Sequence, residues 1–193
     1  MPVVPPVARE VSAPLAPASA AAPVAPADVV PAAPSSPPPT TVVGDSVMAA
    51  IAPALTARFP VLEVDAVTSR QPAGVLEALG VISAAGRLGQ VVVIGAGTNG
   101  AIAEEQLRAM LDLGRPARRV IVLNDSVDRT WEGHNNELIG RIVPEYPNAM
   151  VFDWKTLAAA HPEWLWGDGI HPRPAGADAI AAMLLDEAVR AVA

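Results

Sequence analysis

The chain has 193 residues, of which 20 are acidic and 13 are basic, so its formal net charge is −7, and it contains no cysteine. The absence of cysteine excludes disulfides, thiolate metal sites and a cysteine nucleophile. An acidic chain without a basic stripe is not expected to bind nucleic acid or to dock electrostatically on anionic lipid.

Residues 1–39 hold 12 of the 21 prolines, separated mainly by Ala, Val and Ser. Proline fixes φ and removes a backbone donor, and this segment shows no periodic apolar face. We interpret it as an extended, semi-rigid linker that precedes one domain over residues 40–193. A ligand for a polyproline-binding partner is the alternative. No run is apolar for long enough to span a bilayer, and the N-terminus lacks the basic region of a signal peptide.

From Thr40 onward, short apolar runs alternate with longer amphipathic runs. The short runs predict strands at 40–43, 61–67, 90–94, 119–123 and 149–152. The longer runs predict helices at 48–59, 75–82, 101–113, 132–143 and 174–192. This alternation predicts parallel βαβ units, and the continuous apolar strands indicate a sheet covered on both faces. The expected fold is a flavodoxin-like α/β/α sandwich of three layers with about five parallel strands.

Ser46, in the segment Gly44-Asp45-Ser46, follows the first strand and opens the first helix. Ligands of such folds bind outside the carboxyl ends of the strands, and a helix N-terminus offers free N–H groups that can stabilise an oxyanion. Ser46 is therefore a candidate nucleophile. Taken alone, the motif is more often a helix cap, because Asp and Ser are favoured at that position.

Asp168 and His171, in Asp168-Gly169-Ile170-His171, favour the catalytic interpretation. An aspartate three residues before a histidine can place its carboxylate on Nδ1, which leaves Nε2 free to take the serine proton. The alternative is a solvated loop before the last helix. Of the other two histidines, His134 is expected at the surface of a polar helix and His161 in a loop.

Asn99, in Gly97-Thr98-Asn99-Gly100, ends the third strand at the same predicted sheet edge. A side-chain amide is neutral and can donate to an oxyanion. A simple Gly/Asn turn is an equally good explanation of this motif by itself.

The three motifs together, in this order and at these strand ends, resemble the SGNH (GDSL-like) hydrolase superfamily. The resemblance covers residues 40–193 and implies a Ser46, His171 and Asp168 triad with Asn99 and the Ser46 N–H as oxyanion donors. The superfamily often has a glycine after the second strand that supplies another donor. This chain has Ser69 there, so the backbone of Ser69 or the next residue is the expected donor.

A narrower resemblance is to the extracytoplasmic SGNH domain of peptidoglycan O-acetyltransferases and related membrane acyltransferases. Three groups of residues carry it. The first is Val43–Met48 with Ser69–Gln71, and the second is Ile94–Gly100. The third lies ahead of the Asp168 motif and consists of Asn124, Trp131-Glu132, Asn136, Phe152–Trp154 and Trp164. It implies an extracytoplasmic domain of a membrane-anchored protein, joined by the linker to a membrane acyltransferase domain. The implied partners are an ester or thioester acyl donor and a glycan acceptor.

Four further side chains are predicted to contact substrate: Arg70, Gln71, Trp131 and Trp166. Tryptophan can stack on a sugar ring, although packing at the rim of the core would explain these residues equally well. For Arg70, a structural ion pair is at least as good an explanation.

The sequence predicts a serine-dependent O-acyltransferase that works through an acyl-serine, with esterase activity when no acceptor is present. A free-standing SGNH esterase is the first alternative, and an inactive glycan-binding module is the second. The chemistry needs neither a metal nor a cofactor, and none is predicted.

Overall fold

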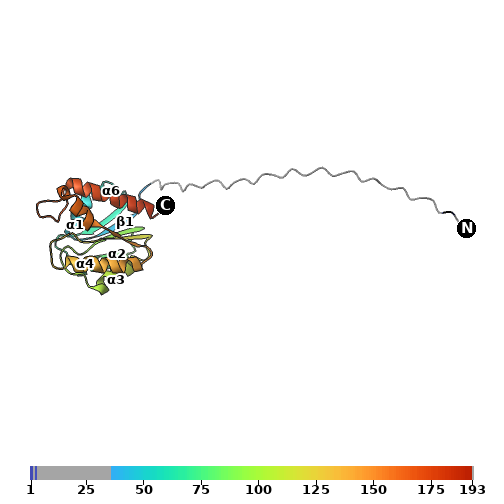
Figure 1. Ribbon diagram of the computed structural model, residues 1–193, viewed down its shortest axis with the longest axis horizontal. Coiled ribbons are helices and arrows are strands. Elements are labelled where there is room, and N and C mark those ends of the chain that lie inside the picture. Colours follow the sequence, from blue (N-terminus) through green and yellow to red (C-terminus); the bar gives the residue numbers. More distant parts are fainter. Residues whose placement is uncertain (2, 4–35, 193) are drawn as a thin grey trace. The chain divides into compact units, whose positions relative to one another are not determined.

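The protein is described by a computed structural model that covers Met1, Val3 and residues 36–192. The predicted linker lies outside the described residues apart from Met1, Val3 and residues 36–39. Residues 36–192 form the predicted α/β/α sandwich (Figure 1). Within that range, no helix is both long and apolar enough to cross a membrane.

Five parallel strands form one sheet in the order β2-β1-β3-β4-β5. Their bounds are β1 Thr40–Gly44, β2 Leu62–Ala66, β3 Val91–Gly95, β4 Arg119–Leu123 and β5 Ala149–Phe152. The two strands that carry the predicted motifs, β1 and β3, are adjacent, and Gly44 is in register with Gly95. The segments that follow these strands therefore leave the sheet side by side.

Six α-helices cover the two faces of the sheet (Figure 1). They are α1 Ser46–Thr56, α2 Pro72–Ala84, α3 Glu104–Leu113, α4 Glu132–Ile142, α5 Trp154–Ala160 and α6 Pro174–Arg190, with short 3₁₀ turns at Val143–Glu145 and Pro162–Trp164. The short helix α5 is absent from the sequence prediction. Its capping residue Asp153, which accepts from the Thr156 N–H, is the local reason that it forms.

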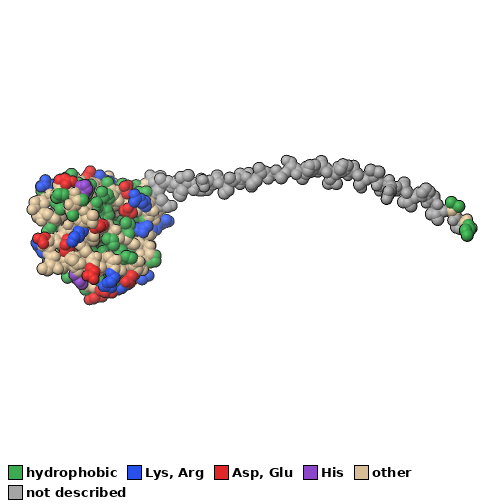
Figure 2. All heavy atoms as spheres, viewed as in Figure 1, with side chains coloured by type: hydrophobic (Ala, Val, Ile, Leu, Met, Phe, Trp, Pro, Cys, Tyr) green, Lys and Arg blue, Asp and Glu red, His purple; other side chains and the backbone are tan. Residues whose placement is uncertain are grey.

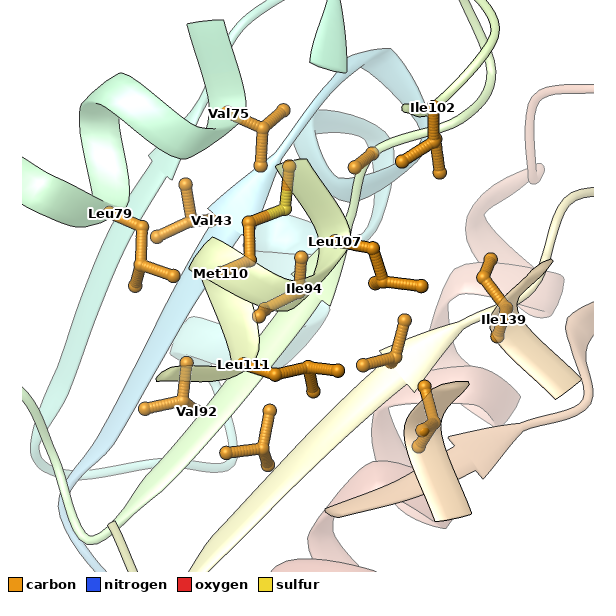
Figure 3. Packing of buried hydrophobic residues seen from close by; sticks show 14 of the residues in the cluster. Val43, Val75, Leu79, Val92, Ile94, Ile102, Leu107, Met110, Leu111 and Ile139 are labelled. Atoms are coloured by element: carbon orange, nitrogen blue, oxygen red, sulfur yellow. The ribbon is translucent and has the colours of Figure 1, made fainter. Parts of the chain in front are cut away.

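Two hydrophobic clusters lie on opposite faces of the sheet. One joins the sheet to α2, α3 and α4, and Figure 3 shows its packing around Ile94, Leu107 and Leu111. The other joins the sheet to α1, α5 and α6. Outside this core, acidic and basic side chains are interspersed on the face seen in Figure 2, so charge of one sign does not dominate that face.

The start of α1 lies close to the sheet because two glycines leave room for one methionine. A Cβ at Gly44 would lie 2.3 Å from Cγ of Met48 and 2.7 Å from the Gly95 carbonyl oxygen. A Cβ at Gly95 would lie 2.7 Å from the same Met48 carbon. Met48 is fully buried, so it cannot move into solvent to relieve such contacts.

We expect Gly44→Ala to lower the free energy of unfolding by about 1–3 kcal/mol, the usual cost of overpacking a core. Urea denaturation would measure this change. Gly140→Ala is the matched control, because Gly140 is exposed on α4 and a Cβ there meets nothing within 4 Å. That control should gain about 0.5–1 kcal/mol from helix propensity. Equal effects at the two sites would contradict the packing explanation.

Candidate active site

Ser46, His171 and Asp168 form a continuous hydrogen-bonded series at the carboxyl edge of the sheet. Nε2 of His171 lies 2.8 Å from Oγ of Ser46, and Nδ1 lies 2.8 Å from Oδ2 of Asp168. This arrangement lets the imidazole accept the serine proton while the carboxylate stabilises the charged ring. The other histidines lie elsewhere: His134 contacts the Ile102 carbonyl, and His161 stacks on Trp164.

The loop before α6 is shaped by the Asp168 carboxylate. Its Oδ1 accepts from the backbone N–H groups of Ile170 and His171 at 2.9 and 3.0 Å, while Gly169 takes a positive φ of 71°. The hydrogen bond from His171, followed by those two backbone donors, lowers the pKa of Asp168 to about 2. Asp168 is therefore ionised at any pH suited to an activity assay.

Ser46 is the first residue of α1 and is largely buried. Asp45 caps the helix by accepting from the Val47 N–H at 3.0 Å. The Ser46 N–H makes no hydrogen bond within the described residues, and it lies at the positive end of the helix. A free donor beside the serine hydroxyl is suited to an oxyanion.

The other two predicted oxyanion donors, Asn99 and Ser69, lie in neighbouring loops. The Asn99 side-chain amide donates to the Arg70 carbonyl at 3.3 Å, which fixes its orientation and leaves its second N–H free of that bond. The Arg70 N–H donates to Val67, whereas the Ser69 N–H has no hydrogen bond within the described residues. Of the two backbone donors expected here, only Ser69 therefore has an unused N–H.

Ser69 has a φ of 63°, the only positive φ among the described residues other than glycine. This is the left-handed region that glycine enters without steric cost. The loop thus keeps the conformation that a glycine would favour, although the sequence supplies a serine.

Arg70 is placed differently from the substrate contact that the sequence predicted. Its guanidinium pairs with Asp65 at 2.6 Å and also donates to the carbonyl oxygens of Asp65 and Gly44. These bonds hold the ends of β1 and β2 together and use three of the five guanidinium N–H groups. The structure therefore favours the structural ion pair.

The remaining predicted contacts surround the Gly97–Gly100 loop or the triad. The Trp131 indole N–H donates to the Gly97 carbonyl at 3.0 Å, so its polar atom supports the loop. The Gln71 side chain lies against Gly100. Trp166 is 53% exposed, and its backbone N–H donates to the His171 carbonyl at 2.9 Å.

Two residues that the sequence did not single out, Asp125 and Asn135, contact the Gly97–Gly100 loop and hold it in place. The Asn135 amide donates to the Asp125 carboxylate at 2.7 Å and to the Gly100 carbonyl at 3.0 Å. A Cβ at Gly97 would lie 1.8 Å from Oδ2 of Asp125, so only glycine allows this approach. The available signal was the position of Asp125 two residues after the end of the fourth strand.

Burial raises the pKa of Asp125 to about 7, since 5% of the residue is exposed. The Asn135 hydrogen bond opposes this shift, while the charges of Asp45 and Glu132 add to it. Burial also raises the pKa of Asp45, against the two backbone N–H groups that it accepts from. Within the described residues, no group of acidic, histidine or cysteine side chains could hold a metal ion.

We expect Ser69→Gly to retain or raise stability, because it removes the left-handed strain of about 1–2 kcal/mol. Ser69→Val should lose at least that amount, because a β-branched residue resists a positive φ. Thermal unfolding of the two variants beside the wild type would measure both changes. If Ser69→Val were as stable as Ser69→Gly, the result would contradict the proposed backbone strain at this position.

Asp125 should make stability fall as pH rises from about 4 to about 7. In that range the folded protein keeps a proton that the unfolded chain has released, so raising the pH favours unfolding. Asp125→Asn removes this titration, and its stability should therefore fall less across the range. Urea denaturation at both ends of the range would measure the difference, with the exposed Asp128→Asn as control. If the free energy of unfolding fell equally with pH in the wild type and in Asp125→Asn, the result would contradict the proposed titration of Asp125.

No protein-family model matches the chain. Eight curated proteins do match it. O-acetyltransferase OatA of Staphylococcus aureus is 32% identical over 147 residues, which cover 74% of this chain and 24% of that protein. Peptidoglycan O-acetyltransferase OatA of Listeria monocytogenes is 31% identical over 145 residues, which cover 75% of this chain and 23% of that protein. The chain thus spans about a quarter of the length of these relatives.

Solved structures show the same fold at lower identity. The C-terminal catalytic domain of Streptococcus pneumoniae peptidoglycan O-acetyltransferase A, determined with a methylsulfonyl adduct, has a TM-score of 0.67 at 21% identity and covers 78% of this chain and 93% of that one. A lipase/acylhydrolase from Enterococcus faecalis has a TM-score of 0.63 at 17% identity, over 78% and 95% of the two chains. The chain is therefore a homologue of a segment of these O-acetyltransferases, and it has the fold of the SGNH (GDSL-like) hydrolases.

Proposed function

We propose that the chain is a serine-dependent O-acyltransferase that moves an acyl group, specifically acetyl, to a glycan hydroxyl through an acyl-serine. The observation that carries this proposal is the series from Ser46 through His171 to Asp168, with 2.8 Å at both contacts. Such a series activates a hydroxyl for attack on an acyl carbon.

In the first half-reaction, Oγ of Ser46 attacks the carbonyl of an ester or thioester while its proton passes to Nε2 of His171. The bond to the leaving group then breaks, and the leaving group takes the proton from Nε2. In the second half-reaction, a sugar hydroxyl attacks the acyl-serine and gives its proton to Nε2. The bond to Oγ breaks, and Ser46 recovers that proton.

The tetrahedral oxygen of each step carries negative charge, and we assign it to the Ser46 N–H, the Ser69 N–H and the Asn99 amide. The support is that the two backbone donors have no hydrogen-bond partner in the part of the chain that the structure describes, and that the amide is held by the Arg70 carbonyl. Donors that are fixed before the reaction need no reorganisation when the charge develops.

Peptidoglycan is the proposed acceptor because the Staphylococcus aureus and Listeria monocytogenes relatives are named as O-acetyltransferases, the second of them for peptidoglycan. By the same homology, we propose an extracytoplasmic SGNH domain over residues 40–193, with a linker over residues 1–39. A membrane acyltransferase domain is the proposed partner that supplies acyl groups. Only the membrane domain would belong to a part of the relatives that the present chain does not span.

A free-standing esterase is the second candidate, and the exposure of the triad favours it. The side chains of His171 and Asp168 are 34% and 46% exposed, so water has a route to the acyl-serine. An inactive glycan-binding module is disfavoured by the complete series from Ser46 to Asp168.

Hydrolysis of a chromogenic acetyl ester tests the proposed nucleophile. We expect Ser46→Ala and His171→Ala to lower kcat by at least about 10³-fold, because the triad residues act as a unit. A fluorophosphonate probe should label Ser46 in the wild type and fail to label either variant. If the wild type and Ser46→Ala hydrolysed the ester equally slowly, the result would contradict the proposed enzymatic activity.

Addition of chitooligosaccharides to the same assay distinguishes transfer from hydrolysis. Acylated saccharide, detected by mass spectrometry and absent with Ser46→Ala, is the expected product. Brisk hydrolysis without any acylated saccharide would instead favour the esterase.

A further inference from the structure

A groove of about 500 Å³ lies between α1 and the start of α6. Its walls are largely apolar and include Ala50, Ala54, Ala57, Trp166, Pro172 and Asp178. A groove of this size is within the range that holds small ligands. It is separate from the oxyanion loops, which lie toward α2 and the end of β3.

The groove leads away from Ser46 along one face of α1. Ala50, Ala54 and Ala57 follow Ser46 by four, eight and eleven residues, and side chains at this spacing share a helix face. Their small side chains leave the space open. The lining on α1 therefore begins one helical turn beyond Ser46.

The opposite wall of the groove belongs to the segment that carries His171. Pro172 follows His171 directly, and the Trp166 N–H donates to the His171 carbonyl. Pro172 also pairs with Leu165 in an isolated bridge. The groove thus opens on the side of the imidazole.

The side of the imidazole is where the alcohol must bind. Nε2 of His171 takes a proton from the attacking hydroxyl and gives one to the leaving oxygen, so both oxygens must come within hydrogen-bond reach of it. The acyl oxygen points instead to the oxyanion donors. A groove lined by Pro172, the residue next to His171, is therefore placed for the acceptor.

The exposed groups along the groove match the chemistry of a sugar. The Trp166 indole is half exposed, and the Arg173 guanidinium lies 5.1 Å from its ring centroid. The Asp178 carboxylate is held by Arg58 at 3.0 Å and remains 63% exposed. An aromatic face can cover the C–H face of a pyranose, and a fixed carboxylate can accept from its hydroxyls. An alkyl chain would make no use of Asp178.

We infer that the groove between α1 and α6 binds the carbohydrate acceptor, with a pyranose ring stacked on Trp166 and its hydroxyls directed to Asp178. This inference rests on the proposed acyl transfer and adds the path by which the acceptor reaches His171.

Nuclear magnetic resonance of the ¹⁵N-labelled chain with chitotetraose tests this path. The indole N–H signals of Trp131, Trp154, Trp164 and Trp166 can be assigned from single Trp→Phe variants. We expect a saturable shift of the Trp166 signal, while the signal of the buried Trp154 stays in place. No shift at millimolar saccharide, or a shift confined to Trp131 beside the oxyanion loop, would overturn the inference.

A pair of alanine variants gives the matched comparison. Ala54→Leu fills the groove and should weaken the saccharide affinity measured at Trp166 by about tenfold. Ala84→Leu makes the same change at the exposed end of α2, on the other face of the sheet, and should leave the affinity unchanged. Equal affinity in two folded variants would also overturn the inference.

Ester hydrolysis by the same preparations separates this inference from the proposed function. If saccharide shifts Trp166 but hydrolysis does not depend on Ser46, the groove is supported and the proposed chemistry fails. If Ser46-dependent hydrolysis is present and Trp166 does not respond, the chemistry stands and the groove is excluded.

Discussion

The carboxylate of Asp45 joins the start of α1 to the Gly97–Gly100 loop, and the geometry of the proposed site depends on this link. One oxygen accepts from the Val47 N–H at 3.0 Å, and the other accepts from the Thr98 N–H at 3.1 Å. Ser46 and Asn99 belong to different βα units, and the adjacency of β1 and β3 alone does not fix their separation. A buried acceptor shared by both segments does, because two charge-assisted bonds hold it.

The same loop is supported from its other side by a second buried carboxyl. Asp125 lies against Gly97, and Asn135 connects it to the Gly100 carbonyl. Two carboxylates so close to one loop would repel each other if both were ionised. The fold limits this repulsion. Burial raises the pKa of Asp125 to about 7, so this carboxyl tends to keep its proton, whereas Asp45 accepts from the backbone N–H groups of Val47 and Thr98.

The sheet could be predicted from the sequence because its strands are short, mainly apolar runs that alternate with longer helical segments, and the fold confirms all five. The triad members could be proposed because each lies in a short motif at a strand end or in the last loop. The full surroundings of Arg70 could not, because the Gly44 carbonyl meets it only after β1 and β2 pair. The contact of Asp125 with Gly97 likewise depends on the register of the folded chain.

The openness of the triad connects the two candidate functions. Nothing in the positions of Ser46, His171 and Asp168 distinguishes a sugar hydroxyl from water as the second nucleophile. Since His171 and Asp168 are partly exposed, exclusion of water cannot come from burial of the site in the described domain alone. It must come from occupancy: an acceptor held beside His171 displaces water and presents its hydroxyl at a high effective concentration. The balance between transfer and hydrolysis then depends on acceptor affinity, and it is decided by side chains outside the triad.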